Sequence, residues 1–427
     1  MTIALIVLLV SMLLLGAPLF AVIMAATMLG FYQAGVDLSV IATEIYRIAD
    51  TPLLVALPLF TLSGYLLSES QTSQRLLQLT RAWFGWMPFG LAIISLMTCA
   101  MFTAFTGASG VTIVALGALL LPVLIQEGYN SKFSLGLVTT TGCLGLLLPP
   151  SVPLILYGVI VQQMNIGEKF TLQELFLAGL LPSLLMIALL AIWAVWANRK
   201  VTLDKTTFSW SEGLASLKAI AWELPLPLFI AGGLFGGFLA ISEVAAVTAL
   251  YVLIIEMFVY KEIQPKHLTK VITEAMKMLG GILLILGVSM AFTNYLIDAE
   301  IPTRLFDWIK AHIDSKFSFL LLLNLFLLLL GAILDIFSAL VIMVPLIVPI
   351  AINYGVHPVH LGIIFLANMQ IGYLTPPVGM DLFIASYRFN KSITELYQAT
   401  FPFVMVLLLA VIIITYVPWL SLWFMHP

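Results

Sequence analysis

Two groups of oxygen-bearing residues in this 427-residue chain could bind a hard cation, because each lies beside a predicted break in an apolar helix. The breaks come from the pattern Gly-x-Leu-x-Pro-Pro, which occurs at residues 145–150 and again at residues 372–377. A double proline ends a helix, since proline has no N–H and its ring clashes with the preceding turn. The freed carbonyl groups, together with nearby hydroxyl and amide oxygens, are ligands that Na⁺ prefers.

Each half of the chain supplies candidate Na⁺ ligands at its break and at a polar, glycine-containing segment upstream of it. In the first half they are Thr106, Gly107, Ser109, Gly110, Gly145, Leu148, Pro149 and Ser151. In the second half they are Gly331, Asp335, Ser338, Asn368, Gln370, Gly372, Thr375 and Pro376. For any single serine or threonine, the alternative is an ordinary hydrogen bond within its helix or to a neighbouring helix.

Two aspartates lie in apolar surroundings, where an ionisable residue is a functional candidate. Asp335 could ligate a cation or cap the helix that follows it. Asp381 lies five residues past Pro376. It could contact substrate or ion, line an aqueous path, or make a structural bond between helices, and the sequence leaves these alternatives open.

The substrate is predicted to be a small organic anion held without a basic side chain, since no lysine or arginine lies in either core pattern. Half-helices that begin after each Pro-Pro would point the positive ends of their dipoles at the middle of the membrane. Helices starting near Ser109 and Ser338 could do the same. The residues predicted to line the substrate site are Ser109, Pro150, Pro377 and Asp381.

The composition indicates an integral membrane protein. Hydrophobic residues make up 62% of the chain and charged residues 9%, against roughly 25% charged in average proteins. Apolar runs of spanning length recur throughout, which favours α-helices surrounded by the lipid bilayer. No Walker sequence is present, so ATP is not expected to be the local energy source. We expect no organic cofactor and no nucleic-acid partner.

Short apolar arms around each polar segment predict re-entrant helical hairpins. The first pair is residues 90–105 and 111–121, and the second is residues 319–330 and 339–349. The alternative is one long helix interrupted by glycine.

The spacing of the helix breakers repeats along the chain. A shift of 227 positions superimposes the two Pro-Pro pairs, and it also lays Pro122 on Pro349 and Gly128 on Gly355. This shared register of helix breakers predicts an internal duplication.

The predicted fold is an all-α membrane protein of about 10–12 transmembrane helices in two inverted repeats, each with a re-entrant hairpin and a Pro-Pro-broken helix.

The two halves and the linker have definite bounds. The first half covers residues 1–196, with a first span at 1–31, a hairpin near 90–122 and a broken helix near 135–160. The second covers 224–427, with a turn near 240–243, a hairpin near 319–349 and a broken helix near 362–386. Residues 197–223 form a polar linker, which with residues 261–277 holds eight lysines or arginines and is therefore predicted to be cytoplasmic.

Other chemistry has weaker support. Cys99 and Cys143 lie in apolar segments and are interpreted as inert buried thiols. His357 and His360 have no evident third ligand, so no metal beyond Na⁺ is expected. An intramembrane enzyme would need a paired aspartate, a Ser/His couple or an Asp-rich metal motif in the spans, and Asp335 and Asp381 lack such motifs.

Residues 145–151, 372–379 and 236–246, together with the apolar start around residues 16–18, are similar to one family. The chain resembles the large membrane subunit, DctM type, of tripartite ATP-independent periplasmic (TRAP) transporters. The resemblance implies an elevator-type architecture with a scaffold domain, and Na⁺ coupling at the tips and breaks named above. It also implies a small four-helix membrane subunit and a periplasmic substrate-binding protein as partners. The family often has a neutral polar residue where this chain has Asp381.

On this resemblance, the expected function is Na⁺-coupled import of a carboxylate-bearing solute, a C4-dicarboxylate, keto acid or sialic acid, as a multi-pass protein of the bacterial inner membrane. The alternative is a stand-alone Na⁺/dicarboxylate symporter or Na⁺/H⁺ antiporter of related architecture, which would need no binding protein. The sequence leaves open the acid, the Na⁺ stoichiometry, the orientation of the N-terminus and the oligomeric state.

Overall fold

The computed structural model describes residues 17–49, 52–86, 90–199, 209–236 and 239–425, together with residues 9, 11 and 12. Within these ranges the chain is helical and contains no strand. Eight helical segments there are long and apolar enough to cross a membrane, and four shorter apolar helices accompany them. The predicted all-α membrane architecture is confirmed. Residues 1–8, 10 and 13–16 of the predicted first span, and residues 200–208 of the linker, lie outside the described residues.

The helices of the first half, in chain order, are α2 (Leu19–Ala34), α3 (Ser39–Ala49), η1 (Pro52–Val55), α4 (Ala56–Glu69), α5 (Thr72–Phe84), α6 (Gly90–Thr106), α7 (Ser109–Gln126), α8 (Ser131–Thr141), η2 (Leu144–Leu147), α9 (Val152–Met164) and α10 (Leu172–Asn198). Helices α6 and α7 form the first hairpin. The run α8–η2–α9 is the first broken helix, interrupted between Leu147 and Val152.

The helices of the second half are α11 (Trp210–Ala219), α12 (Pro225–Phe235), α13 (Ile241–Ile254), the π-helix η3 (Ile255–Val259), α14 (Pro265–Asp298), α15 (Ile301–His312), α16 (Lys316–Ile333), α17 (Ile336–Asn353), α18 (Pro358–Gly372), α19 (Met380–Phe389), α20 (Ile393–Tyr416) and α21 (Trp419–Leu422). Helices α16 and α17 form the second hairpin. The second broken helix is α18 followed by α19.

The two hairpins share their register. Helices α7 and α17 each have 18 residues, and both their first and last residues are 227 positions apart. Beyond them, Gly128 and Gly355 both adopt positive φ, 91° and 70°, a conformation that glycine reaches without the penalty that a Cβ would bring. The same local chemistry therefore ends both hairpins.

The broken helices also begin and break alike. The side chain of Asn130 caps α8, and that of His357, 227 positions later, caps α18. Both Pro–Pro bonds, Pro149–Pro150 and Pro376–Pro377, are cis. These shared caps and breaks extend the repeat from the hairpins into the segments that follow them.

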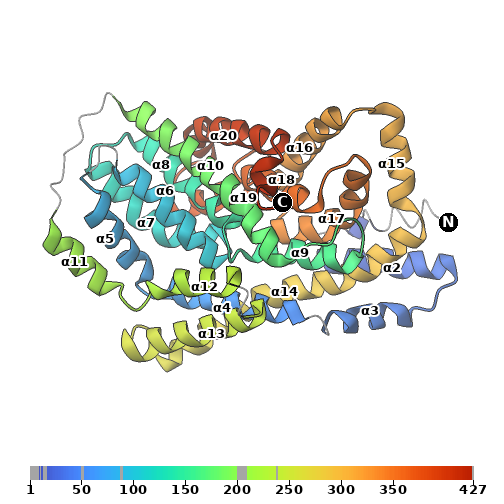
Figure 1. Ribbon diagram of the computed structural model, residues 1–427, viewed down its shortest axis with the longest axis horizontal. Helices are drawn as coiled ribbons and strands as arrows, with labels where there is room; N and C mark the ends of the chain where they lie inside the picture. Colours follow the sequence, from blue (N-terminus) through green and yellow to red (C-terminus); the bar gives the residue numbers. More distant parts are fainter. Residues whose placement is uncertain are drawn as a thin grey trace.

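The helices form two groups. One, which we call the scaffold layer, consists of α2, α3, α4, α12, α13 and α14; α14 packs against α2, α3 and α4, and α13 packs along α4. Figure 1 shows α14 running below α9 and above α3, roughly along the long axis of the molecule. The other group, the core bundle, contains both hairpins and both broken helices.

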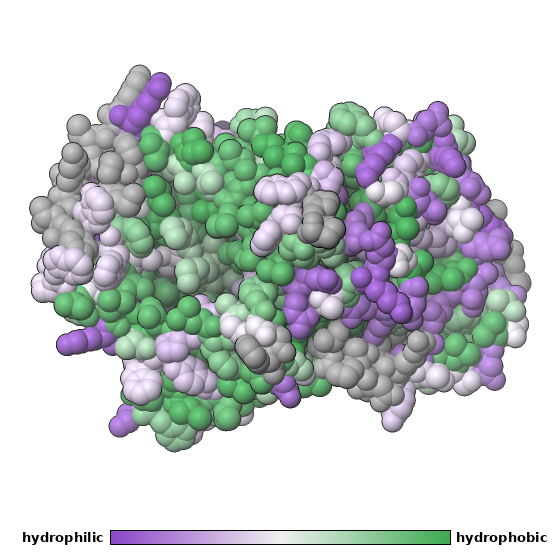
Figure 2. Space-filling view, in the orientation of Figure 1, coloured by the Kyte–Doolittle hydropathy of each residue, from purple (hydrophilic) through white to green (hydrophobic). Residues whose placement is uncertain are grey.

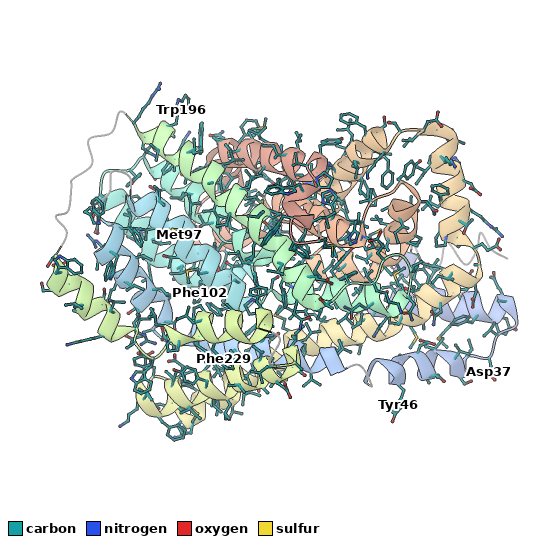
Figure 3. All side chains as sticks on the ribbon, in the orientation of Figure 1. Asp37, Tyr46, Met97, Phe102, Trp196 and Phe229 are labelled. Atoms are coloured by element: carbon teal, nitrogen blue, oxygen red, sulfur yellow. The ribbon has the colours of Figure 1, made fainter. Side chains whose placement is uncertain are left out.

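Helix α18 occupies the centre of the core bundle. All of its residues are buried, as expected for a helix that is apolar on every side. It packs against α16, α17, α10 and α20, which come from both halves of the chain. Side chains fill the space between the helices: Phe102 of α6 lies inside, whereas Tyr46 of α3 points away from the molecule (Figure 3).

The outer surface is largely apolar. Figure 2 shows hydrophobic residues over much of one face, with polar residues gathered toward the end where α15 lies. Helix α15 is amphipathic and carries Arg304, Asp307 and Lys310 between apolar residues such as Trp308, which is 64% exposed. This pattern suits a helix lying at the boundary between lipid and water.

Candidate functional site

The tips of the two hairpins meet at one cavity of about 680 Å³. From the first tip it is lined by residues 107–111, and from the second by residues 335–337. Leu146 and Tyr373, one from each break, reach its wall. The opposite wall belongs to the scaffold layer, through Tyr65 and Glu69 of α4 and Met278 of α14.

The first tip is a tight turn with an open helix end. Gly107 has a φ of +67°, and a Cβ there would lie 2.8 Å from a methyl group of Val152. Helix α7 then begins at Ser109, preceded by Ala108, whose side chain supplies no capping acceptor. The N–H groups of the first turn of α7 therefore face the cavity without a side-chain acceptor.

Ser109 joins this tip to the second half of the chain. Its hydroxyl donates to Asp381 Oδ1 at 2.6 Å, and the Asp381 backbone N–H donates to the Tyr373 carbonyl at 3.2 Å. Asp381 is 0% exposed, and its Oδ2 has no hydrogen-bond partner. Asp381 is not among the residues that line the cavity; it lies behind Ser109, which does line it.

The second tip is closed by its own side chains. Asp335 caps α17, because its Oδ2 accepts from the backbone N–H groups of Phe337 and Ser338 at 3.1 and 3.0 Å. Its Oδ1 accepts from the Ser338 hydroxyl at 2.5 Å. The remaining N–H at this end, that of Ile336, donates to the Tyr373 phenol oxygen at 2.5 Å. The two tips therefore begin their helices at equivalent positions of the repeat but differ in electrostatics. They also differ in backbone conformation, since φ is +67° at Gly107 and −106° at the equivalent Leu334.

The hydroxyl groups at the breaks satisfy local carbonyls. Ser151 donates to the Leu146 carbonyl, and Thr375 donates to the Gly372 carbonyl at 3.0 Å. The second tip and second break also touch through backbone, since a Cβ on Gly372 would lie 2.5 Å from the Cα of Gly331. Carbonyl oxygens and hydroxyl groups of each break are thus held beside the hairpin tips.

Several predicted residues lie away from the cavity. Asn368 donates to Asn324 Oδ1 of α16 at 2.6 Å, and Gln370 is buried with neither side-chain polar atom hydrogen-bonded. The four prolines of the two breaks do not line the cavity either, and the second pair is exposed to solvent. The structure brings together Gly107, Ser109, Gly110 and Asp335 at the cavity wall.

Sequence reasoning missed three residues of this site. Tyr373 accepts a hydrogen bond from the backbone N–H of Ile336 at the second tip. Its position inside the repeated Gly-x-Leu-x-Pro-Pro motif was the sequence signal that could have identified it. Tyr65 and Glu69 come from α4, which carries no motif at all. No lysine or arginine lines the cavity, in which Glu69 and Asp335 are the carboxylates. An anionic group would therefore find its most favourable contact at the uncapped end of α7.

A family model described as "Tripartite ATP-independent periplasmic transporter, DctM component" matches residues 3–420. The chain is 31% identical to the C4-dicarboxylate TRAP transporter large permease protein DctM of Rhodobacter capsulatus, covering 97% of this chain and 96% of that one. It is 31% identical to the isethionate TRAP transporter permease protein DctMQ of Oleidesulfovibrio alaskensis, covering 96% and 64%. The crystal structure of the Alcanivorax borkumensis YdaH transporter shares the fold, with a TM-score of 0.64 at 14% identity over 90% of this chain and 87% of that one.

Proposed function

Because this chain belongs to the DctM family and is the large permease subunit of a TRAP transporter for organic acids, we propose that it imports a small organic anion together with Na⁺. The observation that carries the proposal is the meeting of both hairpin tips at one cavity between the core bundle and the scaffold layer. A site placed there changes its access when one group of helices moves against the other.

The substrate anion is proposed to bind at the start of α7. The N–H groups of its first turn lack a side-chain acceptor, and the Ser109 hydroxyl lies beside them. The corresponding end of α17 is already occupied by Asp335 and Tyr373. Asp381, which holds Ser109, is proposed to set the local charge near the substrate, as Pro150 and Pro377 set the shape of the breaks.

Na⁺ is proposed to bind where each tip faces its break. The first site would draw on carbonyl and hydroxyl oxygens of Thr106, Gly107, Ser109, Gly110, Gly145, Leu148, Pro149 and Ser151. The second would draw on those of Gly331, Asp335, Ser338, Asn368, Gln370, Gly372, Thr375 and Pro376. The contact between Gly331 and Gly372 supports the second site, because it brings tip and break carbonyls close together. A cation there would also offset the negative charges of Asp335 and Asp381.

The protein is proposed to work in the bacterial inner membrane with a small membrane subunit and a periplasmic binding protein that delivers the acid. The DctMQ permease of Oleidesulfovibrio alaskensis, of which this chain covers 64%, supports a second membrane segment as partner. The binding protein would select the acid, and the cavity would accept it by charge and size.

Reconstitution into liposomes tests the proposal. We expect uptake of a labelled C4-dicarboxylate only when the chain is combined with a small membrane subunit and a periplasmic binding protein of the same transporter, and only with an inward Na⁺ gradient. Uptake by the chain alone would instead establish a stand-alone symporter. Uptake that is independent of Na⁺ in every combination would contradict the proposed Na⁺ sites.

A further inference from the structure

One arginine, on α5 just before the first hairpin, contacts three carboxylates away from the cavity described above. Arg75 of α5 is 8% exposed. Its Nε donates to Glu223 Oε1 at 2.9 Å, and its Nη1 donates to Glu262 Oε1 at 2.5 Å. Its Nη2 donates to Glu223 Oε1 and lies 3.6 Å from Glu256 Oε1. We call these four residues the Arg75 cluster.

The charges of the Arg75 cluster do not balance if every group is ionised, since one guanidinium faces three carboxylates. Glu262 is partly exposed and also accepts from the Gln71 backbone N–H at 2.7 Å. Glu223 is 5% exposed and Glu256 is 0% exposed, so water does not offset their charges. The uncompensated charge therefore falls on the two buried glutamates.

The hydrogen bonding of the buried pair is incomplete in a specific way. Glu223 Oε1 accepts from Arg75 and from the Thr72 hydroxyl at 2.9 Å, but Glu223 Oε2 has no partner. Neither carboxyl oxygen of Glu256 has a hydrogen-bond partner. Both glutamates approach the same nitrogen, Nη2 of Arg75, so their carboxyl groups are neighbours. Two ionised carboxylates this close, with no donor between them, repel each other.

We propose that Glu223 and Glu256 share one proton, which makes the Arg75 cluster a buried proton-binding site. The proton gives Glu256 an O–H group, and the unpartnered Oε2 of Glu223 is an acceptor for it. It also removes one of the uncompensated charges. The remaining excess then lies toward Glu262, the member of the cluster in contact with solvent.

The proton connects three segments that are distant in the chain. Arg75 lies on α5, directly before the first hairpin; Glu223 lies in the turn before α12; and Glu256 lies in the π-helix that ends α13. Single-turn π-helices are often found at functional sites. A proton at this point holds the start of the hairpin segment to the scaffold layer.

The groups that face Glu256 are few. They are Arg75 from α5, Glu223 from the turn before α12, and Tyr260 and Glu262 from the segment after η3. The Tyr260 ring lies under the Arg75 guanidinium, 3.9 Å away, and its hydroxyl donates to the Ala219 carbonyl. Helix α4, packed along α13, carries one charged residue, Glu69, at its exposed end.

The direction of the pH dependence of stability follows from the difference in proton binding between the folded and unfolded states. The folded state holds a proton that Glu256 releases at neutral pH once the chain unfolds, so the cluster stabilises the fold at low pH. This stability is lost as the pH rises far enough to remove the proton from the folded state. Deprotonation then places two buried carboxylates on one guanidinium nitrogen and loosens α5 from α12 and α13.

The test uses the full chain in detergent, with the unfolding midpoint followed from mildly acidic to alkaline pH. We expect the wild-type midpoint to fall as the pH rises, and Glu256→Gln, which keeps a donor without a titratable proton, to lose this fall. Glu274→Gln, which changes an exposed glutamate paired with Lys277, is the matched control and should follow the wild type.

Infrared spectroscopy gives a second readout that does not depend on stability. The band of protonated carboxyl groups should lose intensity in Glu256→Gln, and also in Glu223→Gln, which serves if the first variant does not fold. An unchanged band in the folded variants, or a Glu256→Gln midpoint that keeps the wild-type pH dependence, overturns the proposal.

Discussion

The Ser109 hydroxyl donates a 2.6 Å hydrogen bond to Asp381 Oδ1, which joins the first hairpin tip to the helix after the second break across 272 positions of the chain. It is the single hydrogen bond to the Asp381 side chain among the described residues, since Oδ2 has no partner. One interaction therefore links the two repeats directly beside the cavity.

Removing this donor should destabilise the protein through the group left behind. Ser109→Ala leaves the buried Asp381 carboxyl without a hydrogen bond, at a cost of about 1–3 kcal/mol. Adding Asp381→Asn should recover part of the loss, because the residual group is then neutral. Thermal unfolding in detergent, read from tryptophan fluorescence, measures both variants. With Asp381→Asn measured alone as well, a double variant that is less stable than the wild type by the sum of the two single-variant losses would show that the two residues are not coupled.

Sodium affinity should depend on the hydroxyl groups of tip and break. Ser109→Ala and Thr375→Ala are each expected to lower the apparent Na⁺ affinity several-fold, about 1 kcal/mol, and to reduce expression less than affinity. Thr273→Ala is the control, since that hydroxyl lies at an exposed position and donates to the Thr269 carbonyl of its own helix. The measurement is the Na⁺ dependence of uptake in proteoliposomes. If a variant keeps the wild-type Na⁺ dependence of uptake, the substituted residue is not a ligand of the proposed sites.

The contact between second tip and second break should not tolerate a side chain. Gly372→Ala places a Cβ 2.5 Å from the Gly331 backbone, which cannot move as a flexible side chain would. We expect the free energy of unfolding to fall by more than about 2 kcal/mol, and the yield of folded protein to be low. Gly280→Ala in α14, where nothing lies within 4 Å, should be neutral or slightly stabilising. The two variants are compared by their size-exclusion profiles and unfolding midpoints. If Gly372→Ala were as stable as Gly280→Ala, the close packing of Gly372 on Gly331 would be contradicted.

The charge of Glu69 should weaken binding of anions at the cavity. Glu69→Gln removes a carboxylate that lines the cavity and has no cationic partner among the described residues, so apparent affinity for a dicarboxylate should rise a few-fold, roughly 0.5–1 kcal/mol. The concentration dependence of uptake with partner proteins present measures it. Glu212→Gln on exposed α11 should leave affinity unchanged. A Glu69→Gln variant with wild-type or lower affinity would contradict an anion-binding cavity.

Helix breakers made much of the architecture predictable. Proline and glycine act on the backbone within a few residues, so the repeat register between Gly128 and Gly355 and both Pro-Pro breaks could be read directly from their spacing. The hairpins followed from the short apolar arms. The structure adds that the second broken helix begins at Pro358, a few residues before the predicted start.

Contacts between distant segments were not predictable in the same way. Tyr373 reaches Ile336 through the packing of the second break on the second tip. Glu69 reaches the cavity because α4 packs against α6 of the first hairpin. The Arg75 cluster unites residues up to 187 positions apart, and none of them belongs to a motif. Such contacts depend on where helices settle, which no local pattern specifies.

The equal length of α7 and α17 has a geometric consequence. Eighteen residues at 1.5 Å each give about 27 Å, close to the roughly 30 Å thickness of a bilayer core. An arm of that length standing upright would nearly cross the bilayer core, and the tips of both arms line the same cavity. The two helices therefore carry their tips to the cavity over equal lengths. One residue added to either would move its tip by about 1.5 Å and turn it by about 100°, shifting the depth of the cavity unless the other arm changed with it.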